Sequence, residues 1–144
     1  MRIYLPSTLT AVALALTEGE FRGGPRAAYA VTPALRARYG DDEEELEYAA
    51  LSAAADASAL LLAAAPDEPA RRVVIAAELP DAVVRPAADP GSPAEVVVEA
   101  AVPLKRVASA HVDDEAAAAD VAAGRGEDHE LLWYATQELR YLVG

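Results

Sequence analysis

A long helical segment at about 43–65 is the feature that most constrains what this chain can fold into. Asp42, with Glu45 three residues later, has the pattern of a capping box, and Pro66 ends the segment. The apolar residues of the segment fall in two stripes on opposite sides of a helical wheel. One stripe is Leu46, Ala50, Ala53, Ala57, Leu60, Leu61 and Ala64, and the other is Tyr48, Leu51, Ala55, Ala59 and Leu62. A sheet covers only one such stripe, so the last helix of the chain, or a partner, is expected to cover the other.

Shorter strand and helix patterns surround this segment. Alternating or Val-rich runs predict strands at 2–5, 27–31, 73–79, 95–102 and 107–112. Apolar spacing and capping residues predict helices at 9–18, 33–39, 113–123 and 129–142, the last one capped by Asp128. The Pro-rich stretch 80–94 is expected to be an exposed loop, and 113–126 is an acidic, Ala-rich segment. The order of elements predicts one α+β domain over 1–144, with a mixed β-sheet of about five strands and helices mainly on one face. A ferredoxin-like variant is compatible with this order.

The alanine content predicts a closely spaced core. Alanine supplies 36 of the 144 residues, and the chain has only one Phe and one Trp. Because large side chains are scarce, Trp133 is expected to be at least partly buried as a core filler. A second interpretation is that Trp133 belongs to a binding surface, since Trp, Tyr and Arg are enriched at interface hot spots.

Charge and cysteine content exclude several classes of function. The formal net charge is −12, which repels phosphate, so a nucleic-acid partner is not expected. The absence of cysteine excludes disulfides, thiolate zinc sites and Cys nucleophiles, and it suits a reducing cytoplasm. The apolar run near the N-terminus has helical spacing rather than the form of a signal peptide, and no membrane-spanning segment is expected. The sequence therefore predicts a cytoplasmic protein with neither membrane nor nucleic acid as its partner.

The only two His residues lie among carboxylates and form the one candidate metal site. His111 precedes Asp113, and His129 precedes Glu130. If the two segments meet, His111, Asp113, His129 and Glu130 provide a ligand set that zinc, manganese or iron accepts. The spacing matches no established metal motif, so structural roles at a strand end and a helix start are favoured. Neither a GxSxG elbow nor a Gly-rich phosphate loop is present, and no cofactor is expected.

Five segments carry a resemblance to a known family. They are 1–6 (MRIYLP), 28–33 (AYAVTP), 44–50 (EELEYAA), 107–114 (VASAHVDD) and 127–134 (EDHELLWY). On these segments the chain resembles an uncharacterised family of small proteins, a domain of unknown function, from high-GC actinobacteria. The resemblance implies a cytosolic protein of actinobacterial origin, and it implies no activity, cofactor or catalytic residue.

Two functions from different classes follow from these patterns. The favoured one is a non-catalytic domain that binds a protein partner, or a second copy of itself, through apolar helix surface. The alternative is a metal-dependent enzyme or metal-binding domain that uses the two His clusters. Neither function identifies a catalytic residue in the sequence. The residues expected to bind a partner are Tyr48, Leu51, Leu62, Trp133, Gln137 and Tyr141.

Overall fold

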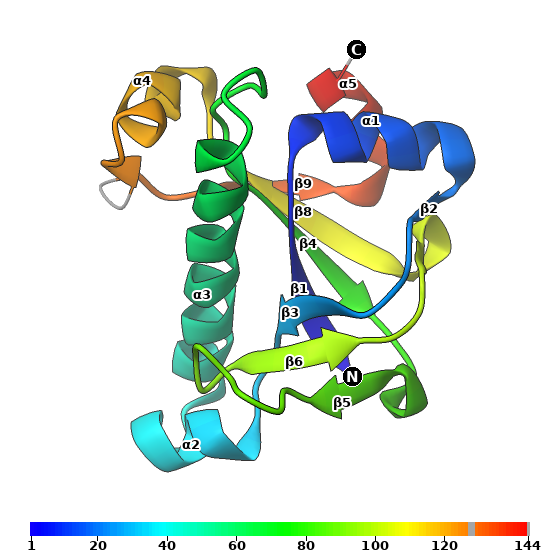
Figure 1. The fold of residues 1–144 in the computed structure, drawn as a ribbon, viewed down its shortest axis with the longest axis vertical. Helices are drawn as coiled ribbons and strands as arrows, with labels where there is room; N and C mark the ends of the chain where they lie inside the picture. Colours follow the sequence, from blue (N-terminus) through cyan, green and yellow to red (C-terminus); the bar gives the residue numbers. More distant parts are fainter. Residues whose placement is uncertain (127–128, 144) are drawn as a thin grey trace.

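The computed structural model describes residues 1–126 and 129–143. Its main sheet contains β1 (Arg2–Ser7), β3 (Arg26–Tyr29), β4 (Val73–Glu78), β5 (Val84–Pro86), β6 (Glu95–Val98), β8 (Val107–Val112) and β9 (Leu132–Ala135). A small second sheet pairs β2 (Glu20–Phe21) with β7 (Val102–Pro103). The helices are α1 (Leu9–Glu18), α2 (Pro33–Tyr39), α3 (Glu43–Ala63), α4 (Ala118–Ala122) and α5 (Leu139–Val143). The predicted α+β class is confirmed (Figure 1).

The main sheet differs from the expected one in size and direction. Its seven strands run in the order β5-β6-β3-β1-β4-β8-β9, and each neighbouring pair is antiparallel. The sheet is therefore antiparallel rather than mixed. The two additional strands come from segments predicted otherwise, since β5 lies within the Pro-rich stretch 80–94 and β9 lies within the predicted last helix.

Helices cover both faces of this sheet rather than mainly one. Ile3 and Leu5 of β1 pack with α1 and α5, whereas Tyr4 between them packs with α3. Figure 1 shows α1 and α3 on opposite sides of the central strands. The ferredoxin-like variant is not observed, because that fold packs its helices on one face of the sheet, whereas α1 and α3 cover opposite faces here.

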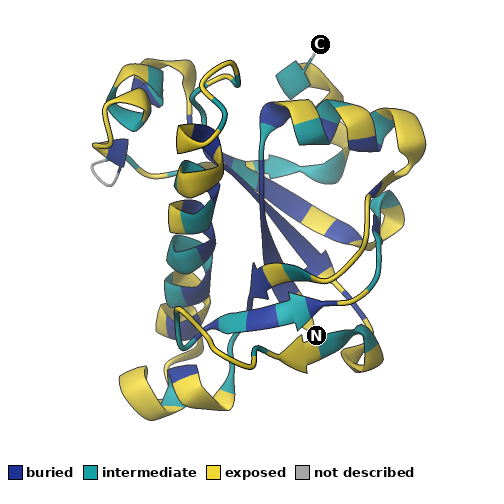
Figure 2. Cartoon of the chain, viewed as in Figure 1, coloured by how far each residue is buried: buried dark blue, intermediate teal, exposed yellow. Residues whose placement is uncertain are grey.

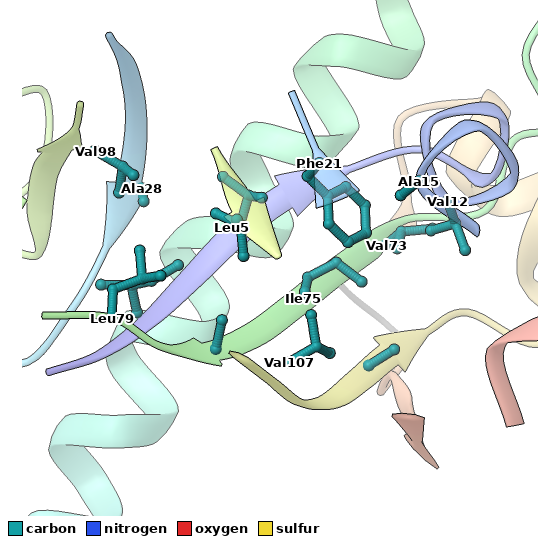
Figure 3. Packing of buried hydrophobic residues seen from close by; sticks show 14 of the residues in the cluster. Leu5, Val12, Ala15, Phe21, Ala28, Val73, Ile75, Leu79, Val98 and Val107 are labelled. Atoms are coloured by element: carbon teal, nitrogen blue, oxygen red, sulfur yellow. The ribbon is translucent and has the colours of Figure 1, made fainter. Parts of the chain in front are cut away.

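The core on the α1 side is the larger of the two. Leu5 and Ile75 from the sheet lie beside Val12 of α1 and Phe21 of β2 (Figure 3). Thr8 caps α1 by accepting a hydrogen bond from the Ala11 N–H at 3.1 Å. This face of the sheet is therefore closed by α1 together with α5.

The opposite face is covered by α3 through small side chains. Its buried residues are Leu46, Ala50, Ala54, Ala55, Ser58 and Leu62. Leu46 and Ala50 belong to one predicted stripe and Ala55 and Leu62 to the other, so each stripe is only partly buried. Figure 2 shows the outer side of α3 as a mixture of exposed and intermediate residues, and Leu60 is 73% exposed. The expected Ala-lined core is confirmed here, because alanine and serine let the helix approach the sheet closely.

Ser58 ties α3 to two strands at once. Its hydroxyl donates to the Ser7 carbonyl at 2.8 Å and accepts from the Val73 N–H at 3.0 Å. By length and composition α3 is also apolar enough to cross a membrane. Core helices of globular domains meet the same criterion, and the buried side of α3 packs on the sheet.

The predicted helix at 129–142 is wrong for most of its length. Residues Leu132–Ala135 form the edge strand β9, and only Leu139–Val143 are α-helical. The predicted capping residue Asp128 lies outside the described residues. Trp133 is 61% exposed and belongs to neither core cluster, so its expected core role is also wrong. The segment forms a strand because its apolar and aromatic residues suit a sheet and β8 offers an edge to pair with.

Candidate functional site

Two neighbouring hollows lie between α3 and the β8–β9 end of the sheet, and Tyr48 and Leu51 line both of them. The first, here called the Trp133 hollow, has a volume of about 360 Å³. It is lined by Arg2, Tyr4, Glu44, Glu47, Tyr48, Leu51, Ser109, His111 and Trp133. The second, here called the His129 hollow, has a volume of about 220 Å³. It is lined by Tyr48, Leu51, Ser52, Ala55, Asp56, Arg72, His129, Glu130 and Leu131.

The sheet register builds the floor of the Trp133 hollow. His111 of β8 lies directly opposite Trp133 of β9, and Ser109 lies opposite Ala135. Alternate residues of a strand share one face, so Ser109, His111 and Trp133 all project to the α3 side. Ala76 of β4 lies between Tyr4 and Ser109 in the same row. Because the Ala76 side chain is a single methyl group, this row of the sheet leaves space beneath α3.

His111 is held as a neutral imidazole at the floor of this hollow. Burial lowers the pKa of His111, and the nearby positive charge of Arg2 lowers it further. Its Nε2 lies 3.4 Å from the Ser109 hydroxyl oxygen. Within the described residues no carboxylate bonds to His111, so the pair lacks the third group that orients the base in a Ser-His-Asp triad.

The rim of the Trp133 hollow combines aromatic rings with carboxylates. Tyr48 and Trp133 are each 61% exposed, and Glu44 and Glu47 project from the first turns of α3. Burial raises the pKa of Tyr4, with the charge of Glu47 as the next cause, so its hydroxyl stays protonated at neutral pH. The positive charge of Arg2 is paired with Glu78, with its Nε 2.7 Å from the carboxylate.

A buried ion pair fixes the position of the His129 hollow. The Asp113 carboxylate accepts hydrogen bonds from the Arg72 main-chain N–H at 2.8 Å, from Nε at 2.8 Å and from Nη2 at 2.9 Å. Both side chains are buried, with 7% of Arg72 and none of Asp113 exposed. Arg72 Nη2 also donates to the His129 carbonyl at 3.0 Å. Arg72 therefore connects strand β4 to the chain that enters β9.

His129 forms a second ionic contact at the surface. Its Nε2 lies 2.7 Å from Asp120 of α4, and Arg125 lies 3.1 Å from the same carboxylate. The hydrogen bond with Asp120 raises the pKa of His129. The same hydrogen bond lowers the pKa of Asp120, and the hydrogen bond from Arg125 lowers it further. This contact links α4 to the segment before β9.

The structure does not bring the four predicted metal ligands together. His111 lines one hollow, whereas His129 and Glu130 line the other. Asp113 is buried, and both of its carboxylate oxygens accept hydrogen bonds from Arg72. Among residues 1–126 and 129–143, no three His, Cys, Asp or Glu side chains are placed to hold a metal ion. The predicted metal site is therefore not formed.

The residues predicted to bind a partner are distributed over several places. Tyr48, Leu51 and Trp133 meet at the Trp133 hollow. Leu62 is 8% exposed and belongs to the buried side of α3. Gln137 lies in a 3₁₀ turn (Thr136–Glu138), and Tyr141 is exposed on α5, where the Arg140 guanidinium lies 5.1 Å from its ring. Because the segment 129–142 is not one helix, Trp133, Gln137 and Tyr141 lie in a strand, a 3₁₀ turn and a short helix and share no helix face.

Sequence reasoning missed several residues of the site. The sequence patterns do not indicate Tyr4, Ser109, Glu44 or Glu47 as site residues, and they give His111 a role only at a strand end or as a metal ligand. The alternation of 107–112 contains the signal that Ser109 and His111 share a face, but it does not reveal that Trp133 is the neighbour of His111 in the sheet.

The chain belongs to a family of unknown function, DUF6912, whose model matches residues 1–143. No curated protein and no solved structure matches the chain at a significant level. The resemblance to a domain of unknown function is thus confirmed, and the actinobacterial origin stays a prediction.

Proposed function

We propose that the protein binds an extended segment of a partner protein, which joins the sheet as an added strand beside β9. In the described part of the chain, β9 ends the strand order and pairs with β8 alone. Added strands gain affinity from main-chain hydrogen bonds and specificity from pockets that receive alternate side chains. The two hollows beside β9 supply pockets of this kind on the α3 face.

The contrast between the two edges of the sheet carries this proposal. The β5 edge contains Pro86, and its Arg85 pairs with Glu99. Proline and charge are features by which proteins protect edge strands from unwanted pairing. The β9 strand contains neither proline nor a charged residue, and its Leu132 and Trp133 are 45% and 61% exposed. An apolar, unprotected edge next to hollows is what a strand-adding partner requires.

The open part of the edge is short. The Ala135 N–H donates to the Glu138 carboxylate at 2.9 Å, which closes the edge at its C-terminal end. Leu132, Trp133 and Tyr134 therefore form the stretch beside which a partner segment pairs. A second copy is a poorer occupant than another protein, because two chains of net charge −12 repel each other.

This proposal changes the expected binding surface. The sequence predicts a helix face as the binding surface, whereas the proposed surface is the edge strand β9 together with the side of α3 that lines the hollows. Tyr48, Leu51 and Trp133 belong to it, whereas Leu62, Gln137 and Tyr141 do not. The cytoplasmic location and the lack of a nucleic-acid or membrane partner stay predictions.

Strand addition is tested with synthetic peptides and ¹⁵N-labelled protein. The probe is a nine-residue peptide of alternating threonine and valine with glutamine at its centre. We expect it to shift the amide signals of Leu132, Trp133 and Tyr134. Two N-methylated versions, modified at the odd or at the even residues, provide the control. Since only alternate N–H groups of an added strand face the edge, one version is expected to bind and the other to fail.

Three outcomes would contradict the proposal. Equal binding of both N-methylated peptides would show that main-chain hydrogen bonds are not used. If the peptide shifts amide signals of β5 rather than those of β9, the partner segment binds at the β5 edge instead. A dimer in sedimentation at the concentration used, lost in Trp133→Glu, would identify a second copy as the occupant instead of a partner segment.

A further inference from the structure

We infer that the Trp133 hollow receives a positively charged side chain, arginine or lysine, from the added segment. This inference rests on the proposed function, since the side chain reaches the hollow from a strand paired with β9. It specifies the chemistry of the partner, which is a basic extended segment.

The hollow has the composition of a cation site. Tyr4, Tyr48 and Trp133 contribute three aromatic rings to its lining. Aromatic rings attract ammonium and guanidinium groups through the negative potential of their faces, and several rings together recognise such groups in known cation-binding proteins. The volume of about 360 Å³ is at the small end of the range for ligand pockets, which suits one side chain rather than a large ligand.

The charges around the hollow favour the same ligand. Glu44 and Glu47 lie on one side of α3, three residues apart, and both line the hollow. In residues 1–126 and 129–143 neither carboxylate forms an ion pair, in contrast to the neighbouring Glu43, whose carboxylate lies 2.6 Å from Arg36. Two carboxylates without a cation beside three aromatic rings form a site that a cation completes.

The other polar groups of the hollow do not compete for this role. Arg2 is the one cationic side chain in the lining, and its Nε is already paired with the Glu78 carboxylate at 2.7 Å. His111 is half-buried beside Ser109, and because burial lowers its pKa it adds no charge at neutral pH. The net charge of −12 for the whole chain attracts a basic segment at long range as well.

Register connects the hollow to the edge strand. Trp133 lies opposite His111, and its side chain projects to the α3 side, where Glu44 and Glu47 line the same hollow. In an added strand every second side chain projects to that side too. A central residue of the added strand, paired with Trp133, therefore lies over the hollow.

The test compares peptides that differ only at the central residue. The nine-residue threonine–valine peptide is made with Arg, Lys, Gln or Glu at its centre, and binding is followed by the fluorescence of Trp133, the single Trp of the chain. We expect the Arg and Lys peptides to bind about five- to tenfold more tightly than the Gln peptide. The Glu peptide is expected to bind more weakly than the Gln peptide.

Two charge-matched double variants locate the effect. Glu44→Gln/Glu47→Gln removes the carboxylates of the hollow, and it is expected to abolish the preference for Arg and Lys. Asp41→Asn/Glu45→Gln removes two carboxylates that do not line this hollow, and it is expected to keep the preference. Loss of the preference in both variants would assign it to the general charge and overturn the inference.

The outcomes separate this inference from the proposed function. If all four peptides shift the β9 amides with equal affinity, strand addition holds and the cation site is overturned. If none of the four peptides shifts those amides, the proposed function is overturned, and the inference falls with it.

Discussion

At the scale of single residues, the buried Arg72–Asp113 pair is the most constrained polar contact of the protein. The pair forms two side-chain hydrogen bonds, and Asp113 accepts a third from the Arg72 main chain. Three elements meet there, since Arg72 precedes β4, Asp113 follows β8 and the His129 carbonyl belongs to the segment before β9. Loss of either side chain affects all three elements together.

We predict that Asp113→Ala lowers the free energy of unfolding by about 3–5 kcal/mol, because a buried guanidinium loses its carboxylate. Urea denaturation followed by circular dichroism measures the change. Glu115→Gln, two residues away and exposed, is the control and is expected to stay within about 0.5 kcal/mol of wild type. Equal stability of Asp113→Ala and Glu115→Gln would show that the pair contributes nothing to folding.

The two His residues are expected to titrate on opposite sides of the ordinary value of about 6.5. Burial lowers the pKa of His111, so its contribution to stability is present above the unfolded pKa and is lost as pH falls through the folded pKa. The hydrogen bond with Asp120 raises the pKa of His129, so its contribution is present below the unfolded pKa and is lost as pH rises through the folded pKa. A ¹H–¹³C NMR titration resolves both imidazoles.

Asp120→Asn serves as the matched control for this titration. It is expected to bring the His129 midpoint back toward the ordinary pKa and to leave the His111 midpoint unchanged. Identical midpoints for the two His residues of the wild-type protein would contradict the different environments that the structure gives them.

At the scale of elements, the segment 129–143 provides the sharpest contrast between burial and exposure. Leu139 of α5 is fully buried in the α1-side core, whereas Trp133 of β9 is 61% exposed. We predict that Leu139→Ala lowers the free energy of unfolding by about 2–5 kcal/mol, through lost burial and a cavity. Trp133→Ala is expected to cost less than about 1 kcal/mol.

Chemical denaturation of the two variants checks this order. Leu60→Ala, which truncates a side chain that is 73% exposed on α3, gives the baseline for an exposed apolar residue. A loss for Trp133→Ala that equals the loss for Leu139→Ala would restore the core role that the sequence suggested for the tryptophan.

Elements that are marked by local signals, such as a capping residue, a proline at a helix start or an alternating strand pattern, could be predicted from the sequence. Asp42 caps α3 as expected, Thr8, one of two candidate caps with Ser7, caps α1, and Pro33 stands at the start of α2. The predicted strands at 2–5, 73–79 and 107–112 correspond to β1, β4 and β8. Each of these signals lies within a few residues of the element that it defines, so no distant contact was needed to interpret it.

The misassigned elements depend on distant contacts. The run Leu131–Ala135 fits a helix or a strand by composition, and pairing with β8 decides between them. Strict alternation of 107–112 predicts that Val107 shares a face with Ser109 and His111. A register shift between Ala76 and Ala77 instead places Val107 in the same core as Ala110 and Val112. Ser58 and Arg72 gain their partners across 51 and 41 residues, which no local pattern encodes.

At the scale of the whole molecule, the surface carries more negative charge than its ion pairs neutralise. The formal net charge is −12, and the exposed ion pairs are few, such as Arg2–Glu78 and Arg22–Glu18. Like charges on a compact molecule repel one another, and this repulsion lowers the stability of the folded state. The same charge provides long-range attraction for the basic segment proposed above.

We therefore predict that the melting temperature rises by roughly 3 °C between 10 and 150 mM NaCl, because the screening length falls from about 30 to about 8 Å. Differential scanning calorimetry measures the shift. The triple variant Asp41→Asn/Asp67→Asn/Asp89→Asn changes three exposed acids and brings the net charge from −12 to −9, so its shift is expected to be smaller. Salt weakens both the attraction within ion pairs and the repulsion among the excess negative charges. A melting temperature that falls with salt would therefore mean that attractive pairs such as Arg2–Glu78 outweigh the repulsion.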